Sequence, residues 1–305
     1  MYDVKISRKN PALIILLIDQ SHSMNEQFFS AGGKTFTIAQ IAKYVADRFL
    51  YEILSRCLKG NDIYDYVDTA IIGYGTSIKS ALPKVGLDEF PIPSSYLPKI
   101  FIRRNEKNSS DEEFPLPRYE WVESVANGYT SMLSAFNKAK QIIEEWIPDH
   151  RDSFPPIVLN ITDGMPTDDI ELVERMQNNT LGEMETLNIF TTAKKIQEMR
   201  TDNGNVLICN AHVSPEKITQ IEFPNNVDNI ENPFAELMFV MSSVVPKELF
   251  ELGREYRFNL SEGSRFFVFN AEAKTLLNFI NFGSGASLKK VDDQSGNEKL
   301  GLPEK

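Results

Sequence analysis

Unbroken apolar runs and amphipathic repeats alternate along the 305-residue chain. Residues 12–18 form a continuous run of Ala, Leu and Ile, which is typical of a strand buried on both faces of a parallel sheet. Further strands are predicted at residues 67–74, 157–161, 205–213 and 266–269. After a turn at 75–77, residues 78–82 are predicted to return as a short antiparallel edge strand.

Between these strands, apolar residues recur with the spacing of amphipathic helices. The clearest repeat runs from Thr35 to Leu58, and Gly60 and Asn61 after it are typical of a helix stop. Other helices are predicted at residues 131–146, 169–181, 187–200, 246–253 and 271–282. Because strands and helices alternate, the predicted fold class is α/β: a doubly wound, mostly parallel sheet with helices on both faces and one short antiparallel edge strand.

Two segments depart from this alternation. Residues 83–127 are punctuated by proline and carry a charged patch, which predicts a long, mostly irregular insertion. Residues 284–305, rich in Gly, Ser, Lys and acidic residues, are predicted to be a flexible tail. Residues 1–283 are therefore interpreted as a single domain that contains the insertion.

Composition and charge exclude several classes of function. With 43 Asp and Glu against 32 Lys and Arg, the formal net charge is −11, which argues against binding to nucleic acid phosphates. The longest apolar run is much shorter than a membrane-spanning helix, so no membrane insertion is expected. The first residues lack the apolar core of a secretion signal, and two cysteines cannot make a disulfide scaffold, so we expect a cytoplasmic location.

Oxygen-bearing side chains gather in three loops, two that follow predicted strands and one that opens a predicted helix. They are Asp19, Ser21, Ser23, Thr130 and Asp163. Binding sites of α/β sheets lie outside the carboxyl ends of the strands, so the three loops are expected to meet there. Carboxylates and hydroxyls are the ligands that Mg²⁺ and Mn²⁺ prefer, and such a set leaves a position for an outside ligand.

The sequence DQSHS, from Asp19 to Ser23, resembles the D-x-S-x-S signature of von Willebrand factor A domains. The phrases GYTSM around Thr130 and ITDG around Asp163 are similar to the other two parts of that family's metal-ion-dependent adhesion site. The resemblance implies that Ser21, Ser23 and Thr130 contact the metal directly. It also implies that Asp19 and Asp163 act directly or through water, and that a carboxylate of a partner protein completes the coordination.

The resemblance is closest to stand-alone cytoplasmic bacterial members of the family, and it implies a protein-interaction module rather than an enzyme. In this hypothesis, Mg²⁺ or Mn²⁺ at the adhesion site binds an acidic residue of an unidentified protein partner in a signalling or stress-response assembly. His22 stands where Gly is common in the family, and Tyr129 stands where a small residue is frequent. Both side chains could crowd the metal or contact the partner, so they affect which type of partner is expected.

Two other functions stay open. The same site could activate water in a Mg²⁺-dependent hydrolase, for which His22 is the candidate base. Alternatively, the domain is structural and its metal site is vestigial. A phosphate-binding P-loop is excluded, because Gly33-Lys34-Thr35 lacks the Gly that this motif requires at position 28, where the chain has Phe.

Overall fold

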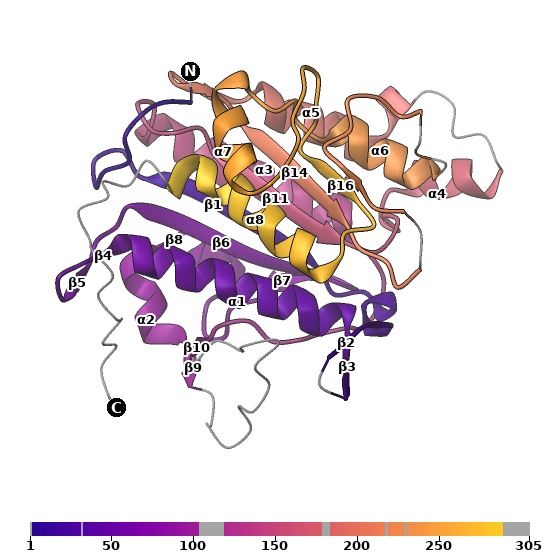
Figure 1. The fold of residues 1–305 in the computed structure, drawn as a ribbon, viewed down its shortest axis with the longest axis horizontal. Helices are drawn as coiled ribbons and strands as arrows, with labels where there is room; N and C mark the ends of the chain where they lie inside the picture. Colours follow the sequence, from indigo (N-terminus) through magenta and orange to yellow (C-terminus); the bar gives the residue numbers. More distant parts are fainter. Residues whose placement is uncertain are drawn as a thin grey trace.

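The computed structural model describes residues 2–31, 33–103, 119–178, 184–216, 219–228, 230 and 232–288. Within these residues, an eight-stranded mixed sheet lies at the centre of the fold (Figure 1). Its strands are β1 (Ala12–Asp19), β6 (Val67–Tyr74), β7 (Ile78–Ser80), β8 (Ile92–Pro93), β11 (Ile157–Thr162), β14 (Leu207–His212), β15 (Ile221–Glu222) and β16 (Phe267–Phe269). The strand order is β15–β16–β14–β11–β1–β6–β7, and β8 also pairs with β6.

The central strands, from β16 to β6, run parallel. The edge strand β7 returns antiparallel to β6, as predicted. Two further antiparallel pairs, β15 with β16 and β8 with β6, were not predicted. Each involves a two-residue strand, which is too short to leave a periodic pattern in the sequence. The predicted doubly wound, mostly parallel sheet is confirmed.

Helices cover both faces of the sheet (Figure 1). They are α1 (Ile38–Cys57), α2 (Leu97–Ile100), α3 (Met132–Trp146), α4 (Ile170–Gln177), α5 (Asn188–Glu198), α6 (Pro233–Met241), α7 (Phe250–Glu255) and α8 (Ala273–Leu288). Helices α1 and α8 pack on one face and against each other, whereas α3, α5 and α6 pack on the other. Every residue of β1 is buried, as its continuous apolar run predicted.

A row of buried polar side chains crosses the sheet on the face covered by α3 and α6. The Tyr74 hydroxyl donates to Asn160 Oδ1 (2.7 Å), and Asn160 Nδ2 donates to Asn210 Oδ1 (3.0 Å). Asn210 Nδ2 then donates to Ser242 Oγ (2.9 Å), whose hydroxyl donates to Met238 O (2.7 Å). Because each group has a partner, these polar side chains are accommodated inside the core. The row joins β6, β11 and β14 to α6.

Short hairpins and turns surround the sheet. The hairpin strands are β2 (Gln27–Ala31), β3 (Lys34–Thr37), β4 (Leu58–Lys59), β5 (Asp62–Ile63), β9 (Ile102–Arg103), β10 (Tyr119–Glu120), β12 (Arg200–Thr201) and β13 (Gly204–Asn205). Single 3₁₀ turns lie at His22–Asn25, Leu87–Glu89, Ser94–Tyr96, Ile147–Asp149, Met184–Thr186 and Lys247–Leu249. A turn at residues 202–203 joins β12 to β13.

The hairpin of β2 and β3 corrects the predicted start of the first helix, because β3 includes Thr35, where the predicted helical repeat begins. The helix begins at Ile38 because Thr37 caps it: Thr37 Oγ1 accepts from Gln40 N (3.3 Å), and Gln40 Oε1 accepts from Thr37 N (2.9 Å). Before this capping box, the rings of Phe29 and Phe36 pack across the hairpin with their centroids 6.4 Å apart.

The described parts of the predicted insertion, residues 83–103 and 119–127, contain short regular elements rather than only irregular chain. The buried Asp47 carboxylate of α1 accepts from the backbone N–H groups of Trp121 (2.7 Å) and Val122 (3.0 Å). The Trp121 indole donates to Leu97 O (2.9 Å). These contacts fix both described arms on α1. Residues 104–118, which include the charged patch, lie outside the described residues.

Helix α8 ends at Leu288, beyond the predicted helix end at residue 282 and the predicted start of the tail at 284. The added turn is made of Gly, Ser and Ala residues, which the composition suggested were tail. They are buried, and a side chain on Gly283 would come within 2.6 Å of Leu159 Cδ2 in β11. Small residues therefore permit close packing on the sheet here. Residues 289–305 of the predicted tail lie outside the described residues.

Two other differences concern the C-terminal third and the N-terminus. Helix α6 was not predicted, since it is apolar almost all round and shows little periodicity. Tyr2 is anchored to the β12–β13 hairpin: its N–H donates to Asn203 O (2.9 Å) and its hydroxyl donates to Asn205 O (3.0 Å).

Among the helices of the described residues, none has the length and apolar character needed to cross a membrane.

Candidate metal centre

Asp19 lies buried at the carboxyl end of β1, where both of its carboxylate oxygens accept hydrogen bonds. Oδ1 accepts from Ser21 N (2.8 Å), and Oδ2 accepts from Thr162 Oγ1 (2.6 Å). Burial and the nearby Asp163 carboxylate raise the pKa of Asp19 to about 7, although the hydrogen bonds from Thr162 and Ser21 act in the opposite direction. The side chain is therefore held in one orientation at the sheet edge.

A chain of hydroxyl groups joins the loop after β1 to the loop after β11. Ser23 Oγ donates to Asp163 Oδ1 (3.0 Å), and Ser21 Oγ lies 3.1 Å from Ser23 Oγ. Because the Ser23 proton is directed to Asp163, Ser21 is the donor in the pair of serines. Ser21 is buried and Ser23 is exposed, so the cluster opens to solvent on the Ser23 side.

The Asp163 carboxylate is the second acidic group of this cluster. Its pKa is raised to about 6, chiefly by burial and further by Glu26, whereas the hydrogen bond from Ser23 lowers it. Asp163 also contributes to the raised pKa of Asp19. Because Asp163 raises the pKa of Asp19 and Glu26 raises the pKa of Asp163, the cluster lies in a region of negative potential, which favours a bound cation.

Thr130 lies beside the turn that follows Asp163. Its side chain is buried, and Oγ1 lies 4.0 Å from the point where a Cβ on Gly164 would stand. Its backbone N–H donates to Thr167 Oγ1 (3.0 Å), and its carbonyl accepts from Thr167 N (2.9 Å). Within the described chain, hydrogen bonds thus unite Asp19, Ser21, Ser23 and Asp163, and Thr130 is held next to them through Thr167.

Two aspartates fix the loop that carries Asp163. Asp168 Oδ1 accepts from Leu133 N (3.0 Å), and its Oδ2 accepts from Ser134 N (2.8 Å), in the first turn of α3. Asp169 Oδ2 accepts from Ile189 N (2.8 Å) in the first turn of α5. Each carboxylate therefore satisfies N–H groups at the N-terminus of a neighbouring helix.

The loop before α3 is packed against the loop after β1 and against the end of β6. Asn127 N donates to Gln20 O (2.7 Å), and His22 N donates to Gly128 O (3.0 Å). Gly128 has φ +89°, and a Cβ there would lie 1.8 Å from Thr76 Oγ1, so only glycine is compatible with this approach. The three loops predicted to meet at the sheet edge are tied together by their backbones.

Sequence reasoning did not assign roles to Thr162, Asp168 and Asp169. Thr162 directly precedes Asp163, and its hydroxyl donates to the buried Asp19 carboxylate on the neighbouring strand. This contact could be predicted only if the register of β1 and β11 were known. Asp168 and Asp169 come just before helix α4, where capping of that helix would be the simplest role for them. Instead they cap α3 and α5, because the loop places those helix N-termini within reach.

The donor set fits a hard divalent cation. The five predicted residues offer two carboxylates and three hydroxyls, and oxygen ligands of this kind suit Mg²⁺ or Mn²⁺. In the described residues no group of three or more His, Cys, Asp and Glu is arranged to hold a metal, so a cation at this edge would depend on hydroxyl ligands. His22, the candidate base, is exposed, and so is Tyr129, at 70% of its surface.

Comparisons with known proteins identify fold similarity only. No family model matches the chain, and no curated protein matches it. Among solved structures, BatB from Bacteroides thetaiotaomicron is 16% identical, with 66% of each chain covered and a TM-score of 0.35. The vWF domain of the type V pili tip protein Mfa5 from Porphyromonas gingivalis is 10% identical, covering 97% of this chain and 99% of that one, with a TM-score of 0.45.

A third similar structure is proximal thread matrix protein 1 from the mussel byssus, at 11% identity, 92% coverage of this chain and a TM-score of 0.44. The chain spans 49% of that protein's length, and 66% of the length of BatB. Because all three TM-scores are below 0.5, we assign neither a family nor a function from these similarities.

Proposed function

We propose that this chain is a protein-interaction module whose binding depends on a divalent cation, Mg²⁺ or Mn²⁺. Asp19, Ser21, Ser23, Thr130 and Asp163 would hold the cation at the carboxyl edge of the sheet. The observation that carries the proposal is the run of hydrogen bonds from Ser21 through Ser23 to Asp163, which gathers oxygen donors from two loops beside the buried Asp19. Hydroxyl and carboxylate oxygens in such proximity can turn their lone pairs to one hard cation.

The proposed partner is a protein that presents an acidic side chain. Three of the five ligands are neutral hydroxyls, so two carboxylates would balance a dication without surrounding it with excess negative charge. A partner carboxylate would then bind from the solvent side, where Ser23 is exposed. When bound, the cation would supply the charge that attracts this carboxylate to a chain whose own net charge is −11.

The proposed role is binding, without catalysis, because the gathered residues are metal ligands and the groups that orient them. Thr162 holds Asp19, and Asp168 and Asp169 hold the loop of Asp163. On the sequence resemblance alone, we place this binding in a cytoplasmic signalling or stress-response assembly.

Thermal unfolding with and without divalent cations tests the proposal. A ligand that binds only the folded chain raises its melting temperature by mass action, so Mg²⁺ or Mn²⁺ should raise the midpoint above that measured in EDTA. Ser23→Ala and Asp19→Ala should reduce or abolish this rise. Ser23 is exposed, so its variant tests the site without disturbing the core.

The matched control is Asp152→Ala, which removes an exposed carboxylate away from the cluster. It should keep the full response to the cation. A wild-type chain that gains no stability from either cation, or a Ser23→Ala chain that responds as strongly as Asp152→Ala, would overturn the proposal.

A further inference from the structure

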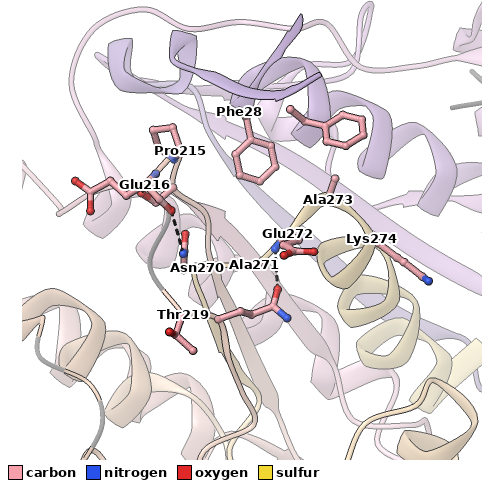
Figure 2. A pocket seen from close by; sticks show the side chains of 12 residues that line it. Phe28, Pro215, Glu216, Thr219, Asn270, Ala271, Glu272, Ala273 and Lys274 are labelled. Atoms are coloured by element: carbon pink, nitrogen blue, oxygen red, sulfur yellow. Dashed lines mark hydrogen bonds between the residues drawn. The ribbon is translucent and has the colours of Figure 1, made fainter. Parts of the chain in front are cut away.

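A pocket of about 700 Å³ opens at the same sheet edge, between the β2–β3 hairpin, the loop after β14 and the start of α8 (Figure 2). Its walls include Phe28, Phe29, Glu216, Gln220, Asn270 and Glu272. None of the five proposed metal ligands lines it. Its size is that of a ligand pocket, and it is large enough for a side chain with part of its backbone.

One wall is aromatic and the opposite wall is polar. In Figure 2 the ring of Phe28 faces the centre of the pocket, across from Asn270 and Ala271. The neighbouring Phe29 is held by its packing on Phe36. An aromatic face exposed in a pocket attracts cations through the negative potential above the ring.

The polar wall is ordered by hydrogen bonds within the chain. Asn270 Nδ2 donates to Glu216 O (3.2 Å), and Gln220 Oε1 accepts from Glu272 N (2.8 Å). Gln220 Nε2 donates to Glu222 Oε1 (2.7 Å). This wall is therefore formed before any ligand enters, which lowers the entropy cost of binding.

Among the residues that the structure describes here, acidic groups dominate the charge around the pocket. Glu216 and Glu272 line it and Glu222 lies beside it, whereas Lys274 is the basic residue among the described lining side chains. Burial and the nearby Glu272 raise the pKa of Glu222. Within the described chain, neither the Glu222 nor the Glu272 carboxylate takes part in an ion pair. The N-terminus of α8 adds roughly half a positive charge, which Glu272 beside it offsets.

We propose that this pocket binds an arginine side chain from a protein partner. The aliphatic stem would pack on Phe28 and Ala273, and the planar guanidinium would stack on the Phe28 ring while donating to the Glu272 carboxylate. Arginine fits better than a compact ammonium because its flat, delocalised cation both stacks and forms directional hydrogen bonds. This binding is independent of the proposed metal site.

An NMR titration in EDTA tests the proposal with the peptide Ac-Gly-Gly-Arg-Gly-Gly-NH₂. The side-chain amides of Gln220 and Asn270 and the backbone amide of Phe28 report from within the pocket. They should shift in a saturable manner at millimolar peptide. The same peptide with citrulline in place of arginine keeps the shape but lacks the charge, and it should bind at least about fivefold more weakly.

Two variants separate a pocket effect from a general charge effect. Glu272→Gln should weaken binding of the arginine peptide about fivefold. Glu198→Gln, which removes one exposed charge at the end of α5, should leave it unchanged. The proposal is overturned if the pocket amides do not shift, if citrulline binds as well as arginine, or if the two variants behave alike. Because EDTA is present throughout, none of these results depends on the metal site.

Discussion

Single carboxylates and hydroxyls at strand ends account for most of the geometry of the candidate metal centre. Asp19 stands out as a candidate site residue in the sequence, because it terminates an apolar strand and begins the DQSHS motif. Its partner Thr162 is not, because the 2.6 Å hydrogen bond between them depends on the parallel register of β1 and β11. The sequence therefore predicts the kinds of ligand, whereas the register determines which groups orient them.

His212 gives a prediction about pH at the residue scale. It is buried at the end of β14, with its ring stacked on Phe269 at 4.8 Å, and burial lowers its pKa from 6.5 to about 4. Between those two values the unfolded chain binds a proton that the folded chain excludes, so stability rises with pH across this window. From pH 7 to pH 5, this residue should lower the free energy of unfolding by about 2 kcal/mol.

Urea unfolding of the wild type and of His212→Gln at both pH values measures this contribution. The wild type should lose about 2 kcal/mol more than the variant on acidification. Equal losses in the two proteins would show that His212 does not carry the effect.

At the scale of elements, long strands and amphipathic helices are predictable, and short or atypical elements are not. The apolar runs that form β1 and β6 are long enough to be recognised as strands. The repeats that form α1 and α3 are long enough to show the helical period. The apolar helix α6 and the last turn of α8 depend on packing partners that are distant in sequence. Those partners supply what the local pattern lacks.

Asp168 is expected to matter as a cap of α3. Replacing it by alanine removes the acceptor for the N–H groups of Leu133 and Ser134, which should lower the free energy of unfolding by about 1–2 kcal/mol. Chemical denaturation checks the value. Asp149→Ala, at an exposed carboxylate, is the control and should change stability little. Similar losses in both variants would contradict a capping role.

At the scale of the whole molecule, the row of buried polar side chains connects strand β6 to helix α6 by hydrogen bonds. Tyr74 on β6 and Ser242 after α6 are its ends, and Asn160 and Asn210 are its centre. The sequence does not predict this row, because it forms only when the register places polar residues of adjacent strands opposite each other, as it does Asn160 and Asn210. In the register of β11 and β14, Asn160 lies opposite Asn210, which allows the hydrogen bond between them.

Asn160→Leu should therefore destabilise the fold more than Tyr74→Phe. The leucine leaves the Asn210 side-chain carbonyl without its donor, and it leaves the Tyr74 hydroxyl only the weaker acceptor Ile161 O (3.2 Å), which together should cost about 2–3 kcal/mol. Tyr74→Phe removes one hydroxyl and should cost about 1 kcal/mol. Urea unfolding of the two variants gives the comparison. An Asn160→Leu chain as stable as Tyr74→Phe would mean that the row contributes little.

The anchoring of Tyr2 also has a consequence for how this chain could be tethered. Tyr2 is hydrogen-bonded to the hairpin just before β14, at the amino edge of the sheet, whereas the candidate metal centre and the pocket proposed to bind arginine lie at the carboxyl edge. A cargo or solid support joined ahead of residue 2 would thus be attached at the amino edge of the sheet. Both recognition surfaces would then face outward, away from the point of attachment.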